Sequence, residues 1–347
     1  MIDLREIELV DEDFDRQFMD EWIHDFGACA LSAADQLGLF DAFEGDTLSP
    51  TQLSQQLKLD EIALRATCRA LVAMGAMRCR GDSFALSDFG EKLWVSTSPA
   101  YRGREFDRHR GWEQHERIVE TLRKGWAPLL DTTEAFSEGW RRGDVSADSA
   151  ETFTRVMHSL ILSPSVAAVR SGAFARLRHL VDVGGGSGAL AAAVLAHHPE
   201  SRATVMDLAP VCAASRAILQ DVRSGARVQY CPANFFEDPW PEDADGFSFS
   251  NILHDWPLPT CRQLLQFAFD ALPPGGSVFV HEALLDSDAC SPRMAVLFNL
   301  LMLMNHRGQQ FTQLDLFELL GEAGFSEPRI VIQYSHWSLL RADKPRP

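Results

Sequence analysis

The sequence predicts an α/β protein in which a doubly wound domain, with helices on both faces of a parallel sheet, follows a smaller helical domain. From about residue 177 onward, apolar runs of five or six residues alternate with longer helical segments. That alternation is typical of a parallel sheet covered on both faces. Before that point the apolar residues recur mainly at helical spacing, and 347 residues suit two domains better than one.

The composition indicates a folded, water-soluble protein. Hydrophobic residues make up 46% of the chain and charged residues 23%, close to globular averages. A net charge of −17 repels nucleic-acid phosphates and anionic lipid headgroups, so we expect neither nucleic acid nor a membrane as a partner. The acidic N-terminus, the lack of a long apolar run and seven scattered cysteines predict a cytoplasmic protein with reduced thiols.

The predicted first domain spans residues 1–100. Apolar residues at helical spacing predict one long helix over residues 14–37. Ser49-Pro50 reads as the start of a second helix, and a third follows over residues 60–74. Residues 77–86 contain two short strand-like runs around a Gly-Asp turn, which predicts a hairpin. Helices followed by a hairpin are the outline of a winged helix.

A winged helix suggests DNA binding, but the charges do not favour it. The candidate recognition helix carries Arg65 and Arg69 against Asp60 and Glu61, whereas DNA readers concentrate positive charge on the face that enters the groove. DNA binding therefore stays the minor alternative. We expect this domain to pair two subunits in a homodimer or to cover the site as a lid.

The rest of the chain is predicted to form two further parts. Residues 101–172 are polar and helical in rhythm, and we interpret them as linking helices that roof a substrate cleft. Residues 173–347 are predicted to form the doubly wound domain. Its expected strands are residues 180–183, 203–206, 228–230, 246–249, 277–280 and 330–332.

A glycine-rich turn follows the first of these strands. Gly184, Gly186 and Gly188 lie between the strand and a helical run, where glycines let the backbone approach a ligand and expose helix N-terminal amides. Asp207 ends the next strand, at a place where a carboxylate can accept both hydroxyls of a ribose. These features predict a nucleotide-like ligand, although Asp207 is also open to interpretation as a helix cap.

Five motifs in a fixed order carry a family resemblance. They are residues 181–188 (VDVGGGSG), 207–208 (DL), 234–236 (NFF), 252–256 (ILHDW) and 272–276 (LPPGG). In this order they resemble S-adenosylmethionine-dependent methyltransferases of Rossmann-like fold. Over nearly the whole chain the sequence looks like the plant and bacterial small-molecule O-methyltransferases with an N-terminal winged-helix dimerisation domain.

The resemblance implies S-adenosylmethionine as the cofactor and a set of residues that bind it. Gly184 and Gly186 are implied to pack near its methionine end, Asp207 to hold the ribose, and the region of Asn234 and Phe235 to meet the adenine. The family usually has Asp where Asn234 stands. The implied cofactor-binding residues are Asp182, Gly184, Gly186, Asp207, Leu208, Asn234 and Phe235.

Two chemistries are open for the transferred methyl group. In O-methyltransferases the His of the His-Asp-Trp segment deprotonates a hydroxyl, which implies His254 as general base. A second histidine, His306, follows in a segment expected to border the same cleft. His254, Asp255 and His306 would form two imidazoles and a carboxylate, a set that binds Fe(II) or Zn(II). That set resembles the metal-dependent 2-oxo acid C-methyltransferases.

The main prediction is therefore methyl transfer to the β-carbon of a 2-oxo acid, with His254, Asp255 and His306 as catalytic metal ligands. A metal would stabilise the enolate that such a carbon needs. O-methylation by His254 is the alternative, and a non-methylating, regulatory role is the third.

Three further side chains are assigned to this site, each with a plainer alternative. Arg142 is predicted to bind a substrate carboxylate, and Trp112 is predicted to line the substrate pocket. The plainer interpretations are a surface arginine and a tryptophan packed between helices. Glu282 is interpreted as orienting a base, binding a polar substrate tail or capping a helix.

Overall fold

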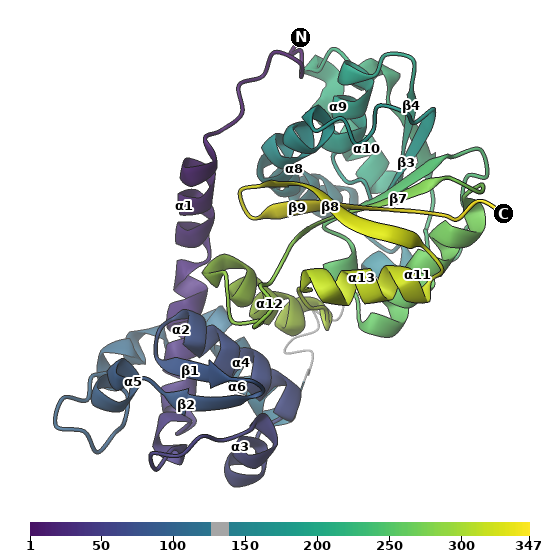
Figure 1. The fold of residues 1–347 in the computed structure, drawn as a ribbon. Helices are drawn as coiled ribbons and strands as arrows, with labels where there is room; N and C mark the ends of the chain where they lie inside the picture. The colour runs from purple at the N-terminus through teal and green to yellow at the C-terminus, as the bar shows by residue number, and fades with distance from the viewer. Residues whose placement is uncertain (126–138) are drawn as a thin grey trace. The chain divides into compact units, whose positions relative to one another are not determined.

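The computed structural model describes residues 1–125 and 139–347 (Figure 1). The chain forms two compact units. The sheet unit comprises residues 1–15, 136–283 and 314–347, and the helical unit comprises residues 16–135 and 284–313. The division predicted at residues 100 and 172 stays a prediction.

The helical unit contains the predicted winged-helix outline. Helix α3 (Pro50–Leu57) and helix α4 (Glu61–Ala73) precede the hairpin of β1 (Met77–Arg80) and β2 (Ser83–Leu86), in which Met77 pairs with Leu86. Its other elements are α2 (His24–Gln36), η1 (Phe40–Ala42), α5 (Asp88–Leu93), η2 (Gly103–His109), α6 (Glu113–Lys124), α12 (Arg293–His306) and most of α1 (Glu12–Trp22).

Local sequence chemistry determines where these helices begin. Ser49 and Gln52 form a reciprocal capping box at the start of α3, and the Asp60 side chain accepts from the amide of Ala63 at the start of α4. The single helix predicted over residues 14–37 is wrong, because α1 and α2 meet at Ile23. The apolar spacing continues across that junction, so it leaves no signal in the sequence.

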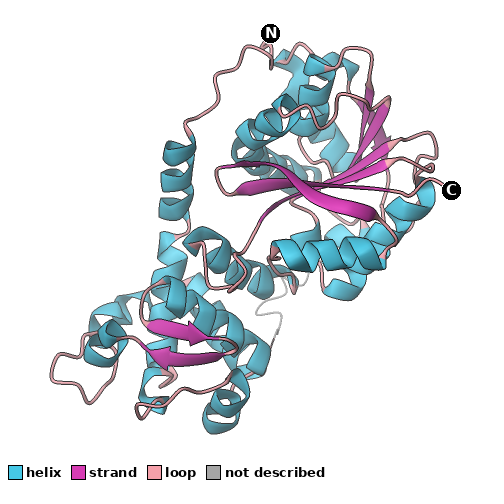
Figure 2. Cartoon of the chain, viewed as in Figure 1, coloured by secondary structure: helices cyan, strands magenta, loops and turns pink. Residues whose placement is uncertain are grey.

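The sheet unit is built on seven strands in the order β5-β4-β3-β6-β7-β9-β8 (Figure 2). The first five in that order are parallel, whereas β9 and β8 are antiparallel to their neighbours. The strands are β3 (His179–Val183), β4 (Arg202–Asp207), β5 (Gln229–Pro232), β6 (Gly246–Ser250), β7 (Ser277–Ala283), β8 (Ser326–Tyr334) and β9 (Trp337–Asp343).

The doubly wound α/β prediction is confirmed, with one correction. The predicted sheet was entirely parallel and lacked β9, whereas the observed sheet is mixed. A tight turn after Tyr334 sends the chain back along β8 as β9, and β9 then pairs with β7. Two antiparallel strands need only such a turn, whereas parallel strands need a long crossover connection.

Helices cover both faces of this sheet. Helices α8 (Ala147–Arg170), α9 (Ala189–His197) and α10 (Ala209–Ile218) pack together on one face, and α11 (Leu258–Ala271) and α13 (Gln313–Glu322) lie on the other (Figure 1). Short 3-10 turns η3 (Leu219–Asp221), η4 (Gly225–Arg227) and η5 (Leu253–Asp255) complete the unit. Within the described residues, no helix is long and apolar enough to cross a bilayer.

The hydrophobic core of the sheet unit lies between β3 and α9. All five residues of β3 are buried, and α9 buries residues 189–195, four of which are alanines. Small side chains let the helix approach the sheet closely, which brings the turn between β3 and α9 against the strand ends. The N-terminal segment adds Leu4 to this core, and Ile2 forms a parallel bridge with Val222.

Candidate active site

The residues of the predicted site follow the carboxyl ends of the parallel strands. The glycine loop (residues 184–188) follows β3, Asp207 ends β4, and the His254 loop (residues 251–255) follows β6. β3 and β6 are neighbours whose connections run in opposite directions along the sheet. Ligands of open α/β sheets bind at such a switch point.

The glycine loop presents its backbone to the space in front of the sheet. Gly184 and Gly186 have φ of 64° and 52°, conformations that favour glycine. A Cβ on Gly186 would meet no protein atom nearer than 3.9 Å, whereas one on Gly184 would lie 2.4 Å from Ile252. No side chain caps the N-terminus of α9. The loop therefore suits a ligand that approaches the backbone and carries an anionic group.

Asp207 is held by this loop rather than by a charged partner. Its Oδ2 accepts from the amide of Gly186 at 3.0 Å, and its Oδ1 accepts from the amide of Leu208 at 2.7 Å. Burial raises the pKa of Asp207 to about 6, while the two amide hydrogen bonds lower it. Above that pH the carboxylate can accept hydrogen bonds from ribose hydroxyls.

Asp182 lies behind the loop as a second buried acid. Ser248 on β6 donates to its Oδ1 at 2.5 Å. Burial raises the pKa of Asp182 to about 7, against the effect of the Ser248 hydrogen bond. A Cβ on Gly185 would lie 2.8 Å from Oδ2 of Asp182, so this carboxyl group supports the loop from below.

The side-chain amide of Asn234, which an aspartate would lack, donates a hydrogen bond. Its Nδ2 donates to the carbonyl oxygen of Arg141 at 2.8 Å, and its Oδ1 accepts from the amide of Phe236 at 3.1 Å. The guanidinium of Arg141 lies 5.9 Å from the ring of Phe236, which packs against Phe235 at 4.6 Å between centroids. An aspartate at this position could not donate to Arg141.

His254 is buried beside a buried carboxylate. Its Nδ1 lies 2.9 Å from Oε2 of Glu282, and its Nε2 lies 3.5 Å from Oδ1 of Asp255. Side-chain exposure is 3% for His254 and 0% for Glu282, against 28% for Asp255. Glu282 at Nδ1 favours the tautomer with the proton on that nitrogen and the lone pair on Nε2.

Glu282 also holds the backbone on which His254 stands. Its Oε1 accepts from the amides of Ile252, Leu253 and His254 at 3.1, 3.0 and 3.4 Å. The geometry therefore fits two of the interpretations open for Glu282, capping of the turn at residues 253–255 and orientation of a base. One carboxylate holds the His254 loop through Oε1 and faces its imidazole through Oε2, because β6 and β7 are neighbouring strands.

The remaining predicted residues are Trp112, His306 and Arg142. Trp112 and His306 belong to the helical unit, and the side chain of His306 is outside the described part of the structure. Arg142 is an exposed residue of the sheet unit. Within residues 1–125 and 139–347, apart from that side chain, no three His, Cys, Asp or Glu side chains are grouped to hold a metal. The metal triad therefore has no structural support.

The sequence interpretation missed three residues that contact this site. His158 of α8 places Nδ1 3.0 Å from Oγ of Ser187 in the glycine loop. Asn251 and Trp337 are joined by a hydrogen bond behind the His254 loop. The one sequence signal for Asn251 was its place directly before the 252–256 motif (ILHDW). No signal pointed to Trp337, because β9 was not predicted.

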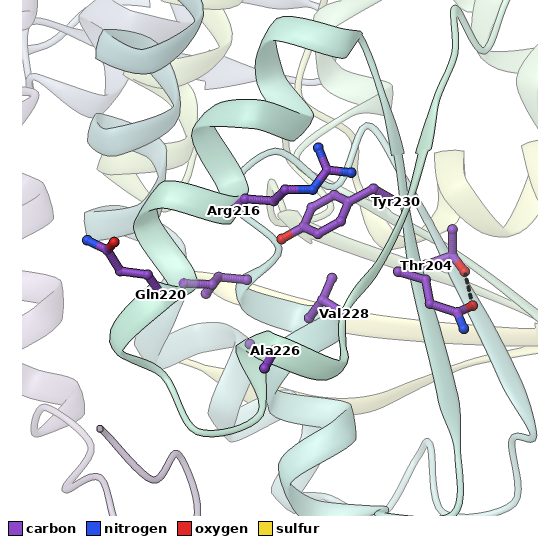
Figure 3. A pocket seen from close by; sticks show the side chains of 9 residues that line it. Thr204, Arg216, Gln220, Ala226, Val228 and Tyr230 are labelled. Atoms are coloured by element: carbon purple, nitrogen blue, oxygen red, sulfur yellow. Dashed lines mark hydrogen bonds between the residues drawn. The ribbon is translucent and has the colours of Figure 1, made fainter.

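A surface groove of about 690 Å³ lies on another part of the sheet unit, against β4 and β5 (Figure 3). The guanidinium of Arg216 lies over the ring of Tyr230 at 4.2 Å, as Figure 3 shows. The groove is lined by Thr204, Arg216, Leu219, Gln220, Gly225, Ala226, Val228, Gln229 and Tyr230. None of these is a predicted site residue, so the groove is distinct from the candidate active site.

Comparison with curated proteins finds related methyltransferases. The chain is 29% identical over 307 residues to 3-hydroxy-5-methyl-1-naphthoate 3-O-methyltransferase from Streptomyces sahachiroi, which covers 87% of this chain and 86% of that protein. It is 28% identical over 335 residues to the tetracenomycin polyketide synthesis 8-O-methyl transferase of Streptomyces glaucescens, with 92% and 94% covered.

Solved structures share the fold. An O-methyltransferase family 2 protein from Planctomyces limnophilus, solved with apigenin, has a TM-score of 0.81 at 24% identity over 99% of both chains. Human N-acetylserotonin methyltransferase, solved with S-adenosylmethionine, has a TM-score of 0.59 at 23% identity over 97% of this chain and 99% of that one.

The family comparison covers most of the sheet unit. Residues 122–326, more than half of the chain, match the family model described as the O-methyltransferase domain. That span includes the glycine loop, Asp207, His254 and Glu282. The chain therefore belongs to the O-methyltransferase domain family of S-adenosylmethionine-dependent methyltransferases.

Proposed function

We propose that this enzyme methylates a hydroxyl group of an aromatic small molecule, with His254 as general base and Glu282 as the residue that orients it. The observation that carries the proposal is the buried pair of His254 and Glu282, 2.9 Å apart at the strand ends beside the glycine loop. Both curated relatives named above are described as O-methyltransferases, one of a hydroxynaphthoate and one in polyketide synthesis.

The residues present fit S-adenosylmethionine. The glycine loop leaves open space at Gly186, and Asp207, which the Gly186 amide holds, offers a carboxylate for the ribose hydroxyls. Asn234 and Phe235 would border the adenine. When bound, the cofactor supplies an electrophilic methyl group on a sulfonium sulfur.

The proposed step moves one proton and one methyl group. Nε2 of His254 would take the proton of the substrate hydroxyl as its oxygen bonds to the methyl group that S-adenosylmethionine would supply, with the cofactor left as a neutral thioether. Glu282 stabilises the imidazolium that forms, because its carboxylate faces Nδ1 at 2.9 Å.

The predicted C-methylation of a 2-oxo acid is not carried into this proposal. It needs His254, Asp255 and His306 on one ion, and the side chain of His306 lies outside the described residues, whereas both curated relatives are described as O-methyltransferases. The assignments of Arg142 and Trp112 to substrate and of two chains to a homodimer remain proposals. The dimer is tested by measuring the molar mass in solution.

One experiment separates the two chemistries. Purified enzyme is incubated with S-adenosylmethionine and 3-hydroxy-5-methyl-1-naphthoate or a panel of phenols, with and without 1,10-phenanthroline, and the methylated product is measured. We expect chelator to leave the rate unchanged and His254→Ala to lower it about 100-fold or more. His197→Ala, a histidine replacement at the end of α9, is the matched control. Methylation of phenylpyruvate that stops with chelator would favour the metal-dependent alternative instead.

A further inference from the structure

The His254 loop begins with a residue in an uncommon backbone conformation. Asn251, directly after β6, has a φ of 53° and is 7% exposed. The left-handed region is unfavourable for residues other than glycine, and asparagine and aspartate tolerate it best. Contacts from the surrounding structure must therefore stabilise Asn251 in this conformation.

An indole from the last strand supplies one such contact. Nε1 of Trp337 donates to Oδ1 of Asn251 at 3.1 Å, and Trp337 is buried. Trp337 is the first residue of β9 and pairs with Ala283, the residue after Glu282. The hydrogen bond therefore reaches the His254 loop from the strand that lies beyond β7.

Strand β7 supports the same loop from its own side. The amide of Asn251 donates to the carbonyl oxygen of His281 at 2.9 Å. Burial lowers the pKa of His281 to about 4, so its imidazole is neutral near pH 7. The next three amides of the loop donate to Glu282. Asn251 is thus the residue at which the supports from β7 and β9 meet.

We propose that Asn251 and Trp337 are positioning residues for His254. The Trp337 hydrogen bond holds the Asn251 side chain, and the left-handed turn at Asn251 sets the direction in which the loop leaves β6. That direction decides whether the imidazole meets Glu282 on one side and a substrate hydroxyl on the other. The inference rests on the proposed function, in which His254 is the base.

Two single variants remove the hydrogen bond from opposite ends. Trp337→Phe keeps an aromatic ring and removes the donor, whereas Asn251→Gly keeps a left-handed backbone and removes the acceptor. With the hydroxynaphthoate as acceptor, we expect each variant to lower kcat about tenfold and to leave the KM for S-adenosylmethionine unchanged. The double variant should be no slower than either single variant, because all three lack the same bond.

A matched control lies in the same hairpin. The Tyr334 hydroxyl donates to the carbonyl oxygen of Val10, and Tyr334 pairs with Trp337 across the β8–β9 turn. Tyr334→Phe therefore removes a hydrogen bond of this hairpin without touching the His254 loop. We expect this variant to keep the wild-type kcat.

A spectroscopic measurement tests the same idea without an acceptor. In the full-length protein labelled with 15N-histidine, the imidazole signals of His254 are those that disappear in His254→Ala. The wild type should show one neutral tautomer, with the proton on Nδ1 beside Glu282. Trp337→Phe and Asn251→Gly should each show a mixture of both tautomers.

The outcomes separate this inference from the proposed function. One tautomer and the wild-type kcat in both variants, even with a lowered Tm, would show that the Asn251–Trp337 bond only packs the core. If Trp337→Phe does not fold, the Asn251→Gly variant alone tests the positioning role. If the enzyme does not methylate the naphthoate, the tautomer of His254 tests that role instead of kcat. A fully active His254→Ala enzyme would overturn the proposed function itself.

Discussion

Replacing Asp207 by asparagine tests the cofactor site without knowledge of the methyl acceptor. The carboxylate accepts the amides of Gly186 in the glycine loop and of Leu208, and burial raises its pKa to about 6. If only the ionised form accepts the ribose hydroxyls, the apparent Kd equals the intrinsic Kd divided by the ionised fraction. That fraction is about 0.1 at pH 5 and close to 1 at pH 7.5, so cofactor affinity should fall about tenfold between these values.

Asp207→Asn should weaken binding and remove the part of this pH dependence that Asp207 causes, whereas Asp182, whose pKa burial raises to about 7, still titrates in this range. A charge-assisted hydrogen bond contributes about 1.5–3 kcal/mol, so the Kd at pH 7.5 should rise about 10- to 150-fold. Two other titratable groups lie near Asp207, namely Asp182 of β3 and Cys212 of α10. Burial raises the pKa of Cys212 to about 12. Cys212 therefore stays neutral over this range.

Calorimetric titration with S-adenosylhomocysteine from pH 5 to pH 8 measures both effects. Asp243→Asn is the matched control, because Asp243 is an exposed acid of the same unit that pairs with Arg202. A wild-type Kd that stays constant from pH 5 to pH 8, or normal binding by Asp207→Asn, would refute the assignment of Asp207 to the ribose.

Three further predictions concern the base, a buried acid and the N-terminal segment. Glu282→Gln places an amide nitrogen against His254 or against the loop amides, and should lower kcat about 10- to 100-fold in the S-adenosylhomocysteine release assay; an unchanged kcat would contradict the orienting role. Burial raises the pKa of Asp182 to about 7, so the folded state keeps a proton that the unfolded state releases, and the free energy of unfolding falls as pH rises from about 4 to about 7. Urea denaturation at about pH 4 and at about pH 7 measures this fall in unfolding free energy, and Asp182→Asn should make it smaller by roughly 4 kcal/mol. An equal fall in the wild type and the variant would show that Asp182 does not cause it. Leu4→Ala should lower the free energy of unfolding by about 2–5 kcal/mol, because Leu4 is 1% exposed in the core. A smaller loss would mean that the N-terminal segment packs loosely.

The sequence by itself determined the features that depend on neighbouring residues. The Ser49-Pro50 start signal predicted where α3 begins. The alternation of strands and helices predicted the doubly wound unit, and the glycine loop was predicted at the turn between β3 and α9. Such features are local, because hydrogen bonds and backbone preferences within a few residues produce them.

Only the tertiary structure decided the features that depend on residues far apart in the chain. Asn251 and Trp337 are 86 positions apart, and Leu4 joins a core built mainly from residues 166–339. Glu282 was visible in the sequence, but its role followed only when β6 and β7 lay side by side and brought it to His254. Side-chain contacts between strands depend on strand order and register, and neither is encoded in the spacing of residues along one segment.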